Sequence, residues 1–147
     1  MLSVIIPANN EGPLIGNAMG ALLASPRPET VEIIVVANGC TDDTVAQALG
    51  FQGQANQKGW ALKVLELPVG NKMMALNAGD AAARGNQRVY LDADVVVNPQ
   101  LLGQLEDALI EDRPLYASGT LRLAKPNTWA SRAYGRIYAR VPFISKG

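Results

Sequence analysis

Two carboxylates that stand two residues apart are the most chemically suggestive feature of this sequence. Asp92 and Asp94 directly follow a short predicted strand at 88–91. On an extended segment residues i and i+2 point to the same side, so both carboxylates can face one ligand. Oxygen ligands without His or Cys suit Mg²⁺ or Mn²⁺, whose coordination shell is usually completed by a ligand's phosphates. The alternative is a chance occurrence, because a D-x-D triplet alone is a weak motif.

A lysine at a predicted helix start is the second such feature. Lys72 follows Gly70 and Asn71, and a helical pattern begins there. A cation is unfavourable at the positive end of a helix dipole unless an anion lies nearby. A phosphate would supply that anion and would also be bound by the helix amides. The alternative is an exposed lysine just outside the helix.

Strands and helices must alternate to position these residues. Apolar, β-branched runs predict strands at 2–7, 31–37, 60–67, 88–91 and 115–123. Helical patterns and helix-start signals lie between and after them, at 12–23, 41–50, 72–84, 101–110 and 127–140. Residues 51–59 are polar and contain glycine, and we predict a loop there.

This order predicts an α/β fold, in which a three-layer α/β/α arrangement surrounds a mostly parallel, Rossmann-like sheet. In such sheets ligands bind outside the carboxyl ends of the strands. Polar side chains follow the first and second predicted strands: Asn9, Asn10, Glu11, Asn38, Thr41 and Asp42. We therefore expect the chemistry at this edge of the sheet.

Several neighbouring residues have a simpler interpretation. Asn38 and the glycine after it are typical of a turn, and Asp42 and Asp43 are predicted to be helix-capping acids. Met73 and Met74 are predicted to pack in the core.

Composition narrows the function further. The 147 residues suffice for one domain, and 48% apolar with 18% charged residues is a globular composition. The absence of histidine excludes Ser-His-Asp and Cys-His catalysis and every histidine metal site. Cys40, the only cysteine, is predicted to be inert and fits a reducing compartment. With no apolar run of roughly 18 residues and no signal-peptide pattern, we expect a cytoplasmic protein.

The formal net charge of zero conceals a segregation of charge. Residues 1–112 hold all 13 acids and six bases, giving −7, whereas residues 113–147 hold seven bases and no acid, giving +7. The overall balance argues against a nucleic-acid partner.

The basic part has a helical repeat over residues 129–141. Arg132, Arg136 and Arg140 recur every four residues, and apolar side chains recur in the same way: Trp129, Ala133, Ile137 and Val141. Such an arginine stripe suits the donor diphosphate, a lipid-phosphate acceptor or the anionic inner face of a membrane. The alternative is a packed helix whose arginines face solvent or the acidic part of the chain.

Four motifs in series resemble those of the family 2 glycosyltransferases, which have the GT-A fold. The motifs are P-A-N-N-E from Pro7, N-G-C-T-D from Asn38, G-N-K-M-M-A-L-N-A-G from Gly70 and L-D-A-D from Leu91. Their order and spacing cover about residues 2–125. The resemblance implies a nucleotide-diphosphate sugar as donor and metal-dependent transfer to an unknown acceptor, either a saccharide or a lipid-linked one.

The resemblance also implies roles for individual residues. The nucleotide pocket would be lined by Pro7, Ala8, Asn10, Glu11 and Asn38. Lys72 would lie by the base or the phosphates, and Asp92 by the ribose or sugar of the donor. Asp94, together with Asp92, would bind Mg²⁺ or Mn²⁺, which would neutralise the leaving nucleoside diphosphate as the sugar becomes oxocarbenium-like.

Two departures from the family pattern bear on these roles. Ala37-Asn38 stands where the family often has two acids, the first of which often reads the base, so the donor base stays open. An inverting member also needs a general base, which the family places in a later acidic motif. This chain has no acid after Asp112, and Glu111 and Asp112 come too early, so no catalytic base is identified.

We therefore expect residues 1–125 to be the donor-binding region and residues 126–147 to be a basic helical tail that begins an incomplete acceptor region. The chain would then be the donor half of a longer enzyme. Two other functions stay open. A sugar-phosphate nucleotidyltransferase needs a glycine-rich basic loop after the first strand, whereas residues 9–12 are acidic and hold one glycine. A non-catalytic nucleotide-binding or partner-binding module is favoured by the missing base.

Overall fold

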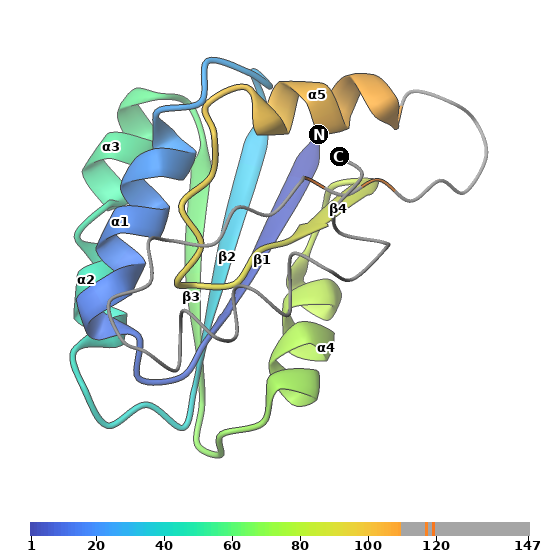
Figure 1. Cartoon of the computed structure of the whole chain (residues 1–147). Helices are drawn as coiled ribbons and strands as arrows, with labels where there is room; N and C mark the ends of the chain where they lie inside the picture. Colours follow the sequence, from blue (N-terminus) through green and yellow to red (C-terminus); the bar gives the residue numbers. More distant parts are fainter. Residues whose placement is uncertain (110–116, 118, 120–147) are drawn as a thin grey trace, which may run out of the picture. The chain divides into compact units, whose positions relative to one another are not determined.

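The computed structural model describes residues 1–109, 117 and 119. Within them four strands form one parallel sheet in the order β3-β2-β1-β4 (Figure 1). The strands are β1 (Leu2–Ala8), β2 (Val31–Asn38), β3 (Ala61–Leu67) and β4 (Gln87–Tyr90). Each lies within about one residue of its predicted position, because a β-branched apolar run bounded by turn residues is a strong strand signal.

Helices cover both faces of this sheet. The first face carries α1 (Gly12–Leu23), α2 (Thr44–Leu49) and α3 (Gln52–Gln57), the opposite face carries α4 (Lys72–Ala82), and α5 (Leu101–Ala108) lies across the amino ends of β1 and β2 (Figure 1). The predicted three-layer α/β/α arrangement is therefore confirmed.

The predicted loop at 51–59 is wrong, because residues 52–57 form α3. Ala55 is fully buried among core residues, and Phe51 and Trp60 pack at the two ends of this segment. One small apolar side chain on a single turn is enough to anchor a short helix against the sheet. Polar composition alone does not exclude this, since five of the six α3 residues are Gln, Gly or Asn.

The burial of the strands follows from this layering. Every residue of β1 and β2 is buried, as expected for central parallel strands with helices on both faces. β3 is an edge strand, and its residues alternate between exposed and partly buried positions. The two central strands therefore form the buried centre of the described fold and end at the same edge.

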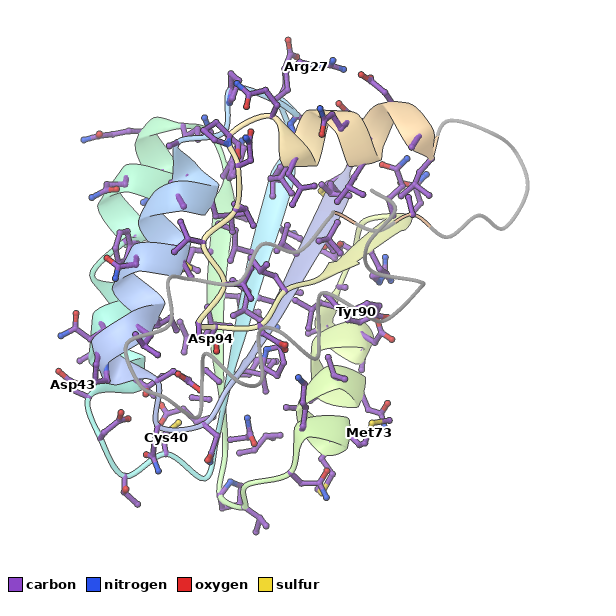
Figure 2. All side chains as sticks on the ribbon, viewed as in Figure 1. Arg27, Cys40, Asp43, Met73, Tyr90 and Asp94 are labelled. Carbon is purple, nitrogen blue, oxygen red and sulfur yellow. The ribbon has the colours of Figure 1, made fainter. Side chains whose placement is uncertain are left out.

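The small residues of α4 explain why Met73 and Met74 are not core residues. Ala75 and Gly79 are the buried residues of α4, and a Cβ on Gly79 would collide with Ile5 of β1. The helix therefore packs closely on the sheet through small side chains. Met73 and Met74 lie on its other side and are 64% and 53% exposed, so the prediction that they pack in the core is wrong (Figure 2 labels Met73).

The strand order defines where a ligand would bind. The chain moves from β1 outward to β3 with its helices on one face, and then returns through α4 on the other face to place β4 beside β1. The carboxyl ends of β1 and β4 flank this reversal, which is the usual ligand site of open α/β sheets.

Some predicted features lie outside the described residues. They are the helix at 127–140, the arginine stripe, the domain boundary at 125 and, apart from Ala117 and Gly119, the strand at 115–123.

Candidate functional site

A pocket lies at the carboxyl edge of the sheet, where the strand order reverses. All four strands contribute to it through their carboxyl ends or the segments that follow them. Its lining residues are Pro7, Asn9, Glu11, Asn38, Gly70, Asn71, Lys72, Asp92, Ala93 and Asp94. The pocket therefore combines segments that are up to 87 positions apart in the sequence. The sheet alone brings them together, because parallel strands end at one edge.

Most of the residues singled out in the sequence meet in this pocket. Six of them line it: Pro7, Glu11, Asn38, Lys72, Asp92 and Asp94. Ala8, the last residue of β1, and Asn10, in the β1–α1 connection, are not among the lining residues. The Ala8 side chain is buried, and Asn10 points toward Thr41, whose backbone N–H donates to its Oδ1 at 2.8 Å.

Asn38 holds three loops of the pocket together. Its side chain is buried, and its Nδ2 donates to the carbonyl of Ala8 at 2.7 Å while its Oδ1 accepts from the backbone N–H of Asn71 at 3.0 Å. Asn9 Nδ2 donates back to the Asn38 carbonyl at 2.5 Å. One donor and one acceptor are thus required at the same side chain, which an amide provides and a carboxylate does not. This explains in physical terms why Asn suits this position.

Lys72 begins α4 on the far side of this network. Asn71 is the N-cap of α4, and its Oδ1 accepts from the backbone N–H of Met74 at 3.0 Å. The Lys72 ammonium lies 2.6 Å from Asp92 Oδ1, and both side chains are more than half exposed. The predicted helix start is confirmed, and the ammonium of this exposed side chain is paired with a carboxylate.

The raised pKa of Glu11 reflects the negative potential of the pocket. Burial raises the pKa of Glu11, and the charges of Asp94, Asp42 and Asp92 raise it further. Among the described residues that line the pocket, three carboxylates face one ammonium. Such a site favours a cation, or a ligand that brings one.

Asp42 has a structural role beside the pocket. Its carboxylate accepts from the backbone N–H of Gly12 at 2.9 Å and from that of Thr44 at 3.0 Å, and so joins the starts of α1 and α2. The hydrogen bond from the Thr44 hydroxyl lowers the pKa of Asp42. Asp43 is the N-cap residue of α2 by position, without a side-chain capping bond. The capping prediction thus fits Asp42 better than Asp43.

The chemistry of the pocket fits a hard divalent cation. Its charged donors are carboxylate oxygens, which suit Mg²⁺ or Mn²⁺. Within the described residues, no group of three or more His, Cys, Asp or Glu side chains is arranged to hold a metal alone. A cation there would be held by one or two carboxylates, and the phosphates of a ligand would complete its shell.

Residues that sequence reasoning left without a role also shape the pocket. Gly39 has a positive φ of 61°, and a Cβ there would collide with the backbone of Gly70. The β2 and β3 loops can therefore touch only because residue 39 is a glycine. The Asn38-Gly39 turn signal was visible in the sequence, but its contact with residue 70 was not.

Comparison with known proteins decides the family. Residues 3–146 match Glycosyl transferase family 2. The chain belongs to this family. An uncharacterized glycosyltransferase of Synechocystis sp. is 30% identical over 143 residues, which is 95% of this chain and 43% of that protein. The dolichyl-phosphate beta-glucosyltransferase of Drosophila melanogaster is 33% identical over 121 residues, which is 77% of this chain and 36% of that protein.

A solved structure extends the likeness to the fold. The mannosyltransferase PcManGT of Pyrobaculum calidifontis, in complex with GDP-Man and Mn²⁺, superposes on this chain with a TM-score of 0.69. The two sequences are 26% identical, and the match covers 76% of this chain and 32% of that one. The predicted GT-A fold is thus confirmed for this member of family 2. The chain spans less than half of the length of each of these proteins. No helix among the described residues is long and apolar enough to cross a membrane.

Proposed function

We propose that this family 2 chain binds a nucleotide-diphosphate sugar, together with Mg²⁺ or Mn²⁺, in the pocket at the carboxyl edge of the sheet. The observation that carries the proposal is the pocket itself, in which the segments after β1, β3 and β4 place three carboxylates and one lysine at the reversal of strand order. The related mannosyltransferase, in complex with GDP-Man and Mn²⁺, supports this choice of ligand.

The residues of the pocket divide between the parts of such a donor. Asp94 and Asp92 would hold the cation, which when bound neutralises charge on the departing nucleoside diphosphate. Lys72 would lie by the phosphates, with Asp92 also beside the ribose or sugar. The nucleotide part of the site would be shaped by Pro7, Ala8, Asn10, Glu11 and Asn38. Ala8 and Asn10 would act through the backbone at the end of β1 and in the β1–α1 connection.

Transfer of the sugar to an acceptor hydroxyl is the activity we propose for the whole enzyme. Removal of the hydroxyl proton requires a general base, and we assign none within residues 1–109. We therefore expect residues 1–125 to bind donor as one region, with residues 126–147 belonging to the acceptor side. The similarity to the dolichyl-phosphate beta-glucosyltransferase favours a lipid-linked acceptor.

Titration calorimetry with UDP-glucose, GDP-mannose and dTDP-glucose, each with and without Mn²⁺, tests the donor site. One of them should bind in a Mn²⁺-dependent manner, and Asp94→Asn should weaken that binding at least about tenfold because a charged metal ligand is lost. Asp107→Asn on α5 is the matched control and should leave affinity unchanged. Absence of Mn²⁺-dependent binding to all three donors would contradict the proposal.

Incubation of the same chain with an excess of the donor that binds, in the presence of Mn²⁺, reveals whether it turns the donor over. We expect binding without release of free sugar, since no base is assigned. A steady release of sugar would instead show that this chain is catalytically complete.

The arginine stripe leads to a separate proposal, that residues 129–141 contact an anionic membrane surface. Sedimentation with vesicles of phosphatidylcholine and phosphatidylglycerol tests it. The parent chain should co-sediment, and changing Arg132, Arg136 and Arg140 together to Gln should reduce this, since each basic residue near such a surface contributes about 1 kcal/mol. Equal sedimentation of both chains, or none of the parent, would leave the packed-helix interpretation.

A further inference from the structure

The Lys72–Asp92 ion pair occupies the place where the proposed donor and cation would meet. The Lys72 Nζ lies 2.6 Å from Asp92 Oδ1. The two side chains are 62% and 55% exposed, so both can move without unpacking the core. Their pairing crosses the pocket from the start of α4 to the loop after β4.

The pocket's charge explains why the pair forms. Glu11, Asp92 and Asp94 line the pocket together, and Lys72 is the cation among the described lining residues. Without a ligand, the ammonium balances part of this negative charge and engages one oxygen of Asp92. A divalent cation that arrives alone therefore meets a positive charge and a carboxylate oxygen that is already bound.

We propose that Lys72 is a resident counter-ion of the empty pocket, and that it makes cation binding depend on the diphosphate. This inference rests on the proposed donor function. The lysine stem is long and flexible, so its ammonium can leave Asp92 for a phosphate oxygen. The phosphate thereby removes the competing charge at the moment when it supplies its own oxygens to the cation.

Binding of the cation and binding of the diphosphate are thermodynamically coupled in this scheme. If the diphosphate strengthens cation binding by some factor, the cation must strengthen diphosphate binding by the same factor. Removing Lys72 should reduce this coupling from both sides. It should strengthen binding of the cation alone and weaken binding of the nucleotide in the presence of the cation.

Lys72→Met keeps the stem and removes the charge. Free Mn²⁺, followed by electron paramagnetic resonance during titration of the protein, should show about threefold to tenfold tighter binding to Lys72→Met than to the parent. Calorimetry with UDP and with GDP at saturating Mn²⁺ should show several-fold weaker nucleotide binding. Lys72→Arg should behave like the parent toward Mn²⁺ alone.

Lys63→Met is the control for loss of a positive charge elsewhere. Lys63 is on β3 and lines a different pocket, so its removal should change neither affinity. Equal or weaker Mn²⁺ binding by Lys72→Met would overturn the counter-ion role, even if UDP or GDP binds normally. If Lys72→Met gains Mn²⁺ affinity while neither chain binds a nucleotide, the counter-ion role stands and the proposed donor function fails.

Discussion

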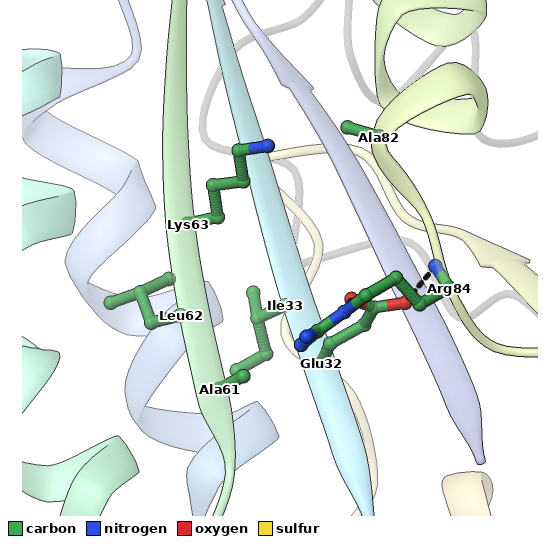
Figure 3. Close-up of a pocket in the computed structure, with 7 residues that line it drawn as sticks. All are labelled: Glu32, Ile33, Ala61, Leu62, Lys63, Ala82 and Arg84. Atoms are coloured by element: carbon green, nitrogen blue, oxygen red, sulfur yellow. Dashed lines mark hydrogen bonds and ion pairs between the residues drawn. The ribbon is translucent and has the colours of Figure 1, made fainter.

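Carboxylates at the two ends of the sheet have opposite surroundings: one is buried and hydrogen-bonded, and the others are clustered around an open pocket. At the amino end, Glu32 of β2 is 4% exposed, and its carboxylate accepts from the Ser3 hydroxyl and from the backbone N–H groups of Arg84 and Gly85. Arg84 Nε lies 3.2 Å from Glu32 Oε2, and Figure 3 shows these two residues side by side. At the carboxyl end, Asp92 and Asp94 are exposed and lie with Glu11 around one lysine.

The pKa directions reflect this difference. Burial alone would raise the pKa of Glu32, but the hydrogen bonds from Ser3, Arg84 and Gly85 outweigh it and lower the pKa to about 2. For Glu11, burial and the neighbouring carboxylates act together and raise the pKa. Ionised Glu32 therefore stabilises the fold, whereas the crowded carboxylates of the pocket oppose one another. A carboxylate cluster that does not serve stability is best explained by the ligand it would bind.

Glu32→Gln should have the largest effect. The amide oxygen can replace the Oε1 atom that accepts from Ser3 and from the two backbone N–H groups, but these hydrogen bonds lose their negative charge and the NH₂ then faces Arg84 Nε. We expect a loss of about 3 kcal/mol in the free energy of unfolding. Urea denaturation followed by tryptophan fluorescence measures this loss. Glu66→Gln, at an exposed position of β3, is the matched control and should change stability by less than about 0.5 kcal/mol. Similar small changes in both variants would contradict the contrast between the two ends.

Asn38→Asp tests whether a buried group at the pocket behaves like Glu32. The carboxylate loses the donor to the Ala8 carbonyl and faces that oxygen with a negative charge, so we expect a loss of about 2 kcal/mol at pH 7. The loss should shrink at low pH, where the protonated acid can donate. Asn10→Asp is the control, because the exposed Asn10 side chain acts as an acceptor from Thr41 and Asp keeps that function. Equal losses in the two variants would argue against the three-loop role of Asn38.

The pH dependence of stability should follow Glu32. A lowered pKa in the folded state gives stability that is complete above the unfolded value of 4.5 and is lost as pH falls toward about 2. Between pH 6 and pH 3 the difference in stability between the parent and Glu32→Gln should shrink by about 2 kcal/mol. Urea titrations of both chains at each pH measure this. A difference that stays constant over this range would mean that Glu32 is not held in its ionised form.

The sequence predicted the strands and most pocket residues because those signals are local. Apolar runs bounded by Pro, Asn and Gly define β1 and β2, and parallel topology then forces Glu11, Asn38, Lys72 and Asp92 to one edge. What could not be predicted depends on tertiary contact. Glu32 reads as one acid in an apolar strand, and its partners at residues 84 and 85 are more than 50 positions away.

The same limit explains the errors. Met73 and Met74 have apolar side chains, but α4 packs through Ala75 and Gly79 because the sheet beneath is close. The segment that forms α3 is polar, yet one buried alanine suffices to dock it. In both cases the deciding quantity is the distance between two surfaces, which residue types along one segment do not encode.

Asp94→Asn should have the smallest effect on stability, and we expect no loss of stability from this substitution. Removing one negative charge from a pocket that raises the pKa of Glu11 relieves repulsion, so the free energy of unfolding should stay the same or rise by less than about 0.5 kcal/mol. Added salt should erase any gain, because it screens exposed charges. Asp42→Asn is the matched comparison: its carboxylate accepts from the backbone of Gly12 and Thr44, so it should destabilise although it too lies near Glu11. If Asp94→Asn were the more destabilising of the two, Asp94 would stabilise the fold, and its carboxylate would no longer point to a bound ligand.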